Sequence, residues 1–172
     1  MSVFRLERYA LQLRAETSSE DAPLPEDALE ALASTRLLVS GKGAGWFLRR
    51  IAYLWCGALL DTRCNTLLLP VMAQVREMDT ALPELLGRRN RECGWGLEEE
   101  FFTERLESGA CLVLLEGLED GPRRVRGALE SYPRCRYLVA SGADDGDAGS
   151  GEDRFDFGGP QARRVVIHRQ GV

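Results

Sequence analysis

The sequence predicts an α/β domain with three layers, in which helices flank a mostly parallel five-stranded sheet. Short apolar runs of strand length alternate along the chain with longer stretches that have the helical period. Each run is continuously apolar, which indicates strands buried on both faces, as in a parallel sheet. The predicted strands are residues 37–39, 67–71, 111–115, 136–139 (running on to Ser141) and 164–167.

Four amphipathic stretches predict the helices that cover this sheet. The longest, at 46–60, is apolar around much of its circumference and is expected to be largely buried. The others are residues 82–89, 98–108 and 122–132, and Gly109 stands where a glycine often ends a helix. Pro25, followed by two acidic residues, predicts a further short helix ahead of the first strand.

Residues 1–24 form an N-terminal extension whose pattern fits two structures. An apolar alternation favours a strand, at Tyr9, Leu11, Leu13 and Ala15. A helical period is also present, at Val3, Leu6, Ala10 and Leu13. We favour the strand, followed by a turn. Residues 25–172 are predicted to form the domain itself, with a flexible acidic loop at 143–160.

The negative charge of the chain is concentrated in that acidic loop. The net charge is −5, and five acidic residues without a basic one lie between 143 and 153. The other 22 acidic residues match the 22 basic ones, so no basic surface for nucleic acid is predicted. No apolar run can span a bilayer and residues 1–10 contain no signal-peptide core, so we expect a cytoplasmic protein without a membrane partner.

Metal binding and thiol catalysis are not predicted. The five cysteines form no CxxC pair, and the single histidine, His168, lies near the end of the chain. No serine or cysteine elbow lies beside His168 in the sequence to suggest nucleophilic catalysis. Cys111 and Cys135 fall in apolar runs and are expected to be small core residues.

Glycines and acidic residues follow three of the predicted strands. In parallel sheets, ligands bind beyond the carboxyl ends of the strands. The glycine-rich loop 41–45, the acidic segment 116–120 and Ser141 should therefore meet at one edge of the sheet. The candidate ligand-facing residues are Gly41, Lys42, Gly43, Gly45, Glu116, Glu119, Asp120 and Ser141.

Three ordered stretches resemble the NTPase core of NACHT proteins, within the STAND class of P-loop ATPases. Residues 36–52, RLLVSGKGAGWFLRRIA, are similar to the family's strand, phosphate loop and following helix. Residues 106–120, LESGACLVLLEGLED, resemble its run of leucines before Asp-Gly-Leu-Asp-Glu. Residues 132–142, YPRCRYLVASG, resemble a strand that the family typically ends in Thr-Ser-Arg. The resemblance implies a P-loop NTPase-like fold over roughly residues 25–170.

The chain departs from this family in the phosphate loop. A working P-loop, Gly-x-x-x-x-Gly-Lys-Ser/Thr, holds phosphates with backbone N–H groups, a lysine and a magnesium-binding hydroxyl. Aligned on the helix, Ala44 replaces the lysine, and Gly45 and Trp46 replace the hydroxyl residues. Aligned on Gly41, the loop is about three residues short. Both alignments lose the lysine from its usual place and the hydroxyl.

The acidic and sensor positions depart from the family as well. Glu116 replaces the aspartate that positions magnesium, and Glu119 and Asp120 invert the usual Asp-Glu pair. Gly142 stands where the family has a sensor-type arginine. The acids are therefore interpreted as a solvated rim after a buried strand.

Two residues of the loop have alternative interpretations. Lys42 is a possible substitute donor to phosphate, but a solvated lysine is the simpler reading of an exposed loop. Trp46 is interpreted as an apolar plug in a vestigial pocket rather than as a platform for a base.

The resemblance and its departures together imply a pseudo-NTPase. Phosphoryl transfer depends on positioning and charge neutralisation, and the groups that supply both are missing. We therefore expect no catalytic residue, no cofactor and no metal, and a protein-interaction or regulatory role with a protein partner, as in bacterial conflict and signalling systems. The alternatives are a nucleotide sensor without hydrolysis and an NTPase completed by a partner subunit. The N-terminal strand, pairing edge to edge, and Trp95 are the expected contact elements.

Overall fold

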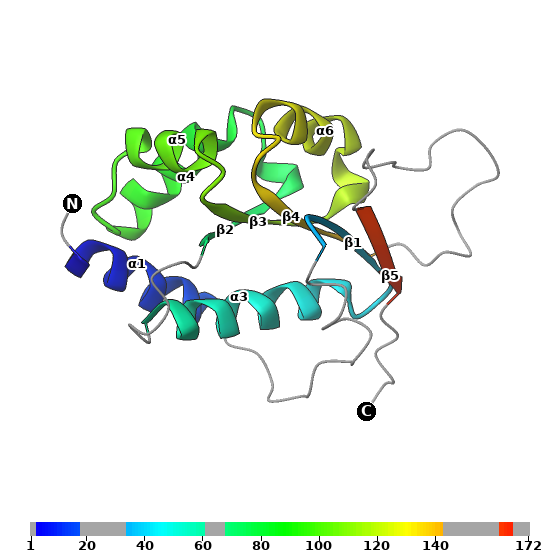
Figure 1. The fold of residues 1–172 in the computed structure, drawn as a ribbon, viewed down its shortest axis with the longest axis horizontal. Helices are drawn as coiled ribbons and strands as arrows, with labels where there is room; N and C mark the ends of the chain where they lie inside the picture. Colours follow the sequence, from blue (N-terminus) through cyan, green and yellow to red (C-terminus); the bar gives the residue numbers. More distant parts are fainter. Residues whose placement is uncertain (1–2, 18–33, 61–67, 143–161, 167–172) are drawn as a thin grey trace.

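A computed structural model describes residues 3–17, 34–60, 68–142 and 162–166. These residues form the predicted α/β domain, with helices on both faces of a parallel sheet (Figure 1). The elements are α1 (Val3–Glu16), β1 (Arg36–Ser40), α3 (Ala44–Leu60), β2 (Leu69–Gln74), α4 (Leu82–Cys93), α5 (Glu99–Glu107), β3 (Cys111–Glu116), α6 (Pro122–Ser131), β4 (Arg136–Ser141) and β5 (Ala162–Val166). The predicted helix from Pro25, the acidic loop and His168 lie outside the described residues.

The strands follow the order β2-β3-β4-β1-β5, and every pairing between them is parallel. The centre is formed by β3, β4 and β1, which are buried over most of their length, as the continuous apolar runs predicted. At one end β2 forms an edge, and at the other β5 pairs with β1. This burial explains why none of the central strands has the alternating pattern of a half-exposed sheet.

The chain crosses the sheet in two directions on opposite faces. From β1, α3 carries the chain along one face to β2 at the far edge, past β4 and β3 (Figure 1). The chain then returns to β3 and β4 through α4, α5 and α6, which lie on the other face (Figure 1). The loops after β1 and β3 therefore leave the same edge of the sheet towards opposite faces. In α/β sheets, ligands bind beyond the carboxyl ends of the strands, near connections that diverge in this way.

Two apolar clusters hold the layers together. On one face α3 buries Phe47, Leu48 and Ile51 against side chains of β1, β3 and β4. The larger cluster joins the opposite face of the sheet to α4, α5 and α6, and it extends to α1. Among the described helices, none combines the length and the hydropathy that crossing a bilayer requires.

The N-terminal segment is a helix, so the preferred strand interpretation is wrong. In α1, Tyr9, Ala10 and Leu13 are buried, whereas Leu11 is 57% exposed. A strand alternation would have placed Leu11 on the buried side with Tyr9 and Leu13. The helical period prevails because it lets one face of α1 pack against α3 and the main core.

This helix and α4 together cover the outer edge of β2. The carbonyl of Pro70 accepts a hydrogen bond from the Tyr9 hydroxyl at 2.7 Å. Two residues along, the carbonyl of Met72 accepts one from Nη1 of Arg89 at 2.9 Å. Pro70 itself has no N–H to offer a neighbouring strand. The edge is thus closed by the chain's own side chains, which overturns the expectation that the N-terminus pairs edge to edge with a partner.

Trp95 is buried, so its expected role as a contact element is also wrong. Only 2% of the residue is exposed, and its ring meets that of Tyr9 edge to face at a centroid distance of 4.9 Å. Gly94 and Gly96, with φ of +65° and +74°, turn the chain on either side of it. The side chain of Asn90 bonds the backbone of Leu97 and fixes this turn. The two glycines beside Trp95 thus turn the chain so that the indole enters the core.

Gly109 ends α5 in the conformation that the sequence predicted. Its φ is +76°, and its N–H donates to the carbonyl of Leu106 at 3.1 Å. A Cβ at this position would lie 2.6 Å from the Cβ of Arg134, so space as well as backbone conformation requires glycine. The tight turn places β3 directly after the helix.

Candidate functional site

The loops that follow β1 and β3 both contact the end of β4 at the carboxyl edge of the sheet, as the sequence predicted. The N–H of Gly41 donates to the carbonyl of Ser141 at 3.1 Å and links the first loop to the end of β4. The N–H of Gly117 donates to the carbonyl of Ala140 at 3.0 Å and links the β3 loop to the same strand. The candidate residues therefore share one rim, with β4 between the other two strands.

The glycine-rich segment is a tight turn. Only residues 41–43 separate β1 from α3. Gly41 has a φ of +99°, and its carbonyl already accepts a hydrogen bond from the N–H of Ala44 at 3.0 Å. The carbonyl of Gly43 accepts the helical bond from Phe47 at 2.9 Å. A loop of this length cannot curve around a phosphate as an eight-residue P-loop does.

A carboxylate of the chain lies on the first turn of α3. A Cβ on Gly45 would be 2.5 Å from Oε1 of Glu116, so a side chain at position 45 would displace this carboxylate. The same oxygen forms an ion pair of 2.7 Å with Nη2 of Arg49, one helical turn further along α3. The start of a helix attracts negative charge through its unpaired N–H groups. Glu116, at the end of β3, places a negative charge beside this first turn.

The other oxygen of Glu116 has a different environment. Oε2 is buried and accepts no hydrogen bond from the described residues. Buried acceptors in folded proteins are nearly always paired, with protein or with another molecule. Oε2 is therefore a buried acceptor that the described residues leave unsatisfied.

Glu119 connects two of the loops at the rim. Its carboxylate accepts a hydrogen bond from the hydroxyl of Ser141 at 3.1 Å and lies 3.3 Å from the N–H of Gly142, which donates to it. In the family that the sequence resembles, the position of Gly142 holds an arginine. In this chain the backbone N–H of Gly142 binds a carboxylate instead. Glu119 thus holds the end of β4 against the loop after β3.

The predicted acidic residues do not converge on a common point. Asp120 is exposed, and its N–H donates to the carbonyl of Gly117 at 3.0 Å in a short 3-10 turn (Leu118–Asp120). Glu116 is directed to α3, whereas Glu119 is directed to β4. Across the part of the chain that the structure describes, no group of three or more His, Cys, Asp or Glu side chains could hold a metal ion.

Lys42 and Trp46 differ in burial. Lys42 is exposed in the turn after β1. Trp46 is half-buried in the first turn of α3, where it packs against the apolar cluster on that face. Its Nε1 is buried without a hydrogen-bond partner among the described residues. The side chain thus belongs to the α3 layer of the core.

Burial keeps the thiol of Cys56 from acting as a nucleophile. Cys56, Cys111 and Cys135 are all buried, and Cys111 and Cys135 lie in the main core, as the sequence predicted. Burial raises the pKa of Cys56 to about 12. A thiol with such a pKa is almost entirely protonated at neutral pH, and the thiolate is the reactive form.

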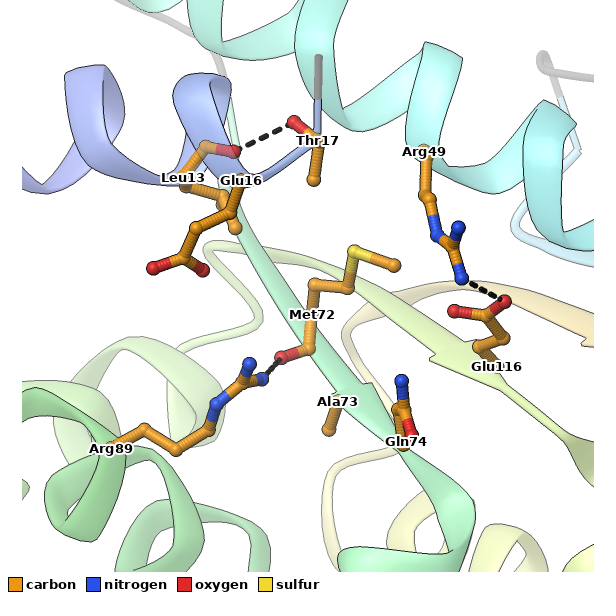
Figure 2. Close-up of a pocket in the computed structure, with 9 residues that line it drawn as sticks. All are labelled: Leu13, Glu16, Thr17, Arg49, Met72, Ala73, Gln74, Arg89 and Glu116. Carbon is orange, nitrogen blue, oxygen red and sulfur yellow. Dashed lines mark hydrogen bonds and ion pairs between the residues drawn. The ribbon is translucent and has the colours of Figure 1, made fainter. Parts of the chain in front are cut away.

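A cavity of about 200 Å³ lies beside the Arg49–Glu116 ion pair, at the carboxyl end of β2 (Figure 2). Its lining comes from five separate elements, which is why sequence reasoning found only Glu116 among its residues. No local motif links side chains that are brought together only by the packing of α1, α3 and α4 around the sheet. The lining residues are Leu13, Glu16, Thr17, Arg49, Met72, Ala73, Gln74, Arg89 and Glu116.

Comparison with known proteins adds no relative to this description. No protein-family model matches the chain, and a search of curated proteins finds no significant match.

Proposed function

We propose that this chain is a degenerate P-loop-type domain of the NACHT/STAND kind that does not hydrolyse nucleoside triphosphates and acts as a protein-interaction or regulatory module. The observation that carries the proposal is the close approach of the Glu116 carboxylate to Gly45, with Arg49 as its counter-ion. Phosphoryl transfer requires cations and backbone N–H groups that are open to phosphate oxygens. Here the helix start and the nearest guanidinium both face a carboxylate of the chain.

The topology supports the first part of this proposal. The three stretches that carry the family resemblance contain β1, β3 and β4, and the loops after β1 and β3 both contact the end of β4. The loops after β1 and β3 leave towards opposite faces, which is the arrangement of a ligand-binding crevice in an α/β sheet. The turn of residues 41–43 supports loss of the ligand, because it is too short to surround a phosphate.

The surface of α1 and α3 supports a role in protein contacts. Leu11 on α1 is 57% exposed and Leu54 on α3 is 42% exposed, and the two helices pack against each other. They are the large apolar side chains that the described surface offers to a partner. This surface replaces the two contact elements expected from the sequence, because Trp95 is buried and the N-terminus is a helix rather than a strand.

Phosphate release from ATP and GTP with Mg²⁺ tests the loss of activity. We expect the rate with the chain to equal that of buffer alone. A rate above buffer that falls in a Lys42→Ala variant would instead favour an active NTPase. Adding a co-purified partner to the same assay tests the alternative in which another subunit completes the site.

Co-purification from the native host tests the interaction role. We expect one or more proteins to be retained by the wild-type chain and lost from a Leu11→Glu, Leu54→Glu double variant. A Glu130→Gln variant, changed on exposed α6 at the opposite face, is the matched control and should retain them. Equal recovery by all three proteins would contradict a contact through α1 and α3.

A further inference from the structure

The cavity at the end of β2 contains charged groups that do not neutralise one another. Arg49 and Glu116 form one ion pair on its α3 side. Glu16, from α1, and Arg89, from α4, lie on the side away from α3 (Figure 2), and no ion pair joins these two in the described part of the chain. Two oppositely charged side chains that line one cavity without pairing with each other can both form charge-assisted hydrogen bonds with a bound molecule.

Each of these two residues has bonding capacity left for a ligand. Arg89 uses Nη1 to donate to the carbonyl of Met72 at 2.9 Å, and a guanidinium has five N–H donors. The carboxylate of Glu16 receives one weak hydrogen bond, from the thiol of Cys93 at 3.9 Å. Both residues therefore keep most of their donors and acceptors.

The α3 side of the cavity supplies further polar groups. Oε2 of Glu116 is a buried acceptor that no described residue satisfies. The side chain of Gln74, the last residue of β2, also lines the cavity (Figure 2), and its amide can both donate and accept hydrogen bonds. A ligand group that donates a hydrogen bond would satisfy Oε2.

The balance of charge selects the class of ligand. Two guanidinium and two carboxylate groups give the lining no net formal charge. An anion would meet Glu16 and Glu116, and a cation would meet Arg49 and Arg89. A molecule with both charges close together avoids both conflicts. The cavity volume of about 200 Å³ equals roughly seven water molecules, which suits a molecule of about ten non-hydrogen atoms.

We propose that this cavity binds a small zwitterion of the free α-amino acid class, with its carboxylate on Arg89 and its ammonium on Glu16. Leu13, Met72 and Ala73 contact the carbon atoms of the ligand, and a side-chain hydroxyl or amide donates to Glu116. The site shares Arg49 and Glu116 with the vestigial nucleotide site, but the residues assigned to the two charges of the ligand, Arg89 and Glu16, lie on α4 and α1, away from the turn after β1.

Calorimetric titration of the full chain tests the ligand class. The probes are glycine, serine and glutamine as zwitterions, with propionate and ethylamine as the carboxylate and the ammonium alone. We expect saturable binding of at least one zwitterion at millimolar concentration or below, and at least tenfold weaker binding of both single-charge probes. Absence of binding by all three zwitterions overturns the proposal. Equal binding of propionate or ethylamine overturns it as well, because one charge would then suffice.

Two variants test the assigned contacts. Glu16 is exposed, and among the described residues its carboxylate accepts one weak hydrogen bond, from Cys93, so Glu16→Gln should leave the fold intact and weaken zwitterion binding about tenfold or more. Arg89→Lys keeps the charge but loses the planar donor fork, and it should also weaken binding. Glu130→Gln on α6 is the matched control and should bind as the wild type does. Wild-type affinity in Glu16→Gln, with its thermal transition unchanged, would contradict the assignment.

Discussion

Gly45 and Glu116 touch across the carboxyl edge of the sheet, because a Cβ on Gly45 would lie 2.5 Å from Oε1 of Glu116. Arg49, on the same helix, binds that oxygen at 2.7 Å. The partial positive charge at the start of α3 and a guanidinium thus face a carboxylate of the protein. In the function that we propose, this carboxylate stands in for the phosphate that a P-loop would hold.

A double-mutant cycle on Arg49→Ala and Glu116→Ala measures the strength of this contact. The Arg49 side chain is 47% exposed and that of Glu116 is 20% exposed, so solvent screens the pair. We expect a coupling free energy of about 0.5–1 kcal/mol at low salt, smaller at high salt. Urea denaturation of the four proteins gives this number. A coupling indistinguishable from zero at low salt would show that the ion pair does not bind α3 to the loop after β3.

Gly45→Ala should uncouple the pair. The added Cβ displaces the end of the Glu116 side chain and separates it from Arg49. The matched control is Gly127→Ala on α6, where a Cβ meets nothing within 4 Å. Alanine in a helix gains about 1 kcal/mol over glycine. We expect the full gain at position 127 and a gain smaller by about 0.2–1 kcal/mol at position 45.

The control for this comparison is the Gly45→Ala, Glu116→Ala double variant. Without the Glu116 carboxylate, the methyl group of an alanine at position 45 has no atom to displace. The double variant should therefore be more stable than Glu116→Ala alone by the full helix-propensity difference between alanine and glycine. Equal stabilisation by Gly45→Ala and Gly127→Ala in the wild-type background would contradict the close contact between Gly45 and Glu116.

Tyr9→Phe tests whether α1 closes the edge of the sheet. The variant leaves the buried carbonyl of Pro70 without its hydrogen bond, at a cost of about 1–3 kcal/mol in unfolding free energy. The matched control is Tyr53→Phe, whose hydroxyl accepts only a half-exposed bond from Arg14 at 3.1 Å. We expect a loss below about 0.5 kcal/mol there. Chemical denaturation measures both losses. Equal losses would mean that the hydrogen bond from Tyr9 to Pro70 does not contribute more to stability than the half-exposed bond of Tyr53.

Most of the sheet could be predicted from the sequence because its strands are buried on both faces. Continuous apolar runs marked β1, β3 and β4, and Gly109 marked the end of α5. The N-terminal helix could not be assigned, because both periods were present in the sequence. Only contacts made by the folded chain, with α3 and with Trp95, decide which period is buried.

The thiol of Cys56 predicts a loss of stability at alkaline pH. Burial raises its pKa from 9.0 to about 12 in the folded chain. The unfolded thiol therefore ionises first, and the stabilisation present below pH 9 is lost as pH rises towards 12. We expect the slope of unfolding free energy against pH in this window to be smaller in Cys56→Ala, by up to about 1.4 kcal/mol per unit. Identical slopes for the two proteins would show that this thiol does not contribute.

The position of the candidate site could be predicted, but its chemistry could not. Loops after parallel strands share one edge by topology, so Gly41, Glu116 and Ser141 were correctly placed at the rim. The direction in which each acid points depends on partners from other elements. Arg49 draws Glu116 towards α3, whereas Ser141 holds Glu119 on β4. No pattern in the sequence contains these pairings.

Calorimetric titration of the wild-type chain with ATP and excess Mg²⁺ tests the central claim most directly. The Glu116 carboxylate beside the first turn of α3 and the short turn after β1 predict no saturable heat, and no rise in thermal stability at the same ligand concentration. A productive site would instead add about 2.7 kcal/mol of stability when the ligand reaches 100 times its dissociation constant. Saturable binding of ATP that is lost in Lys42→Ala and strengthened in Glu116→Ala would contradict the account.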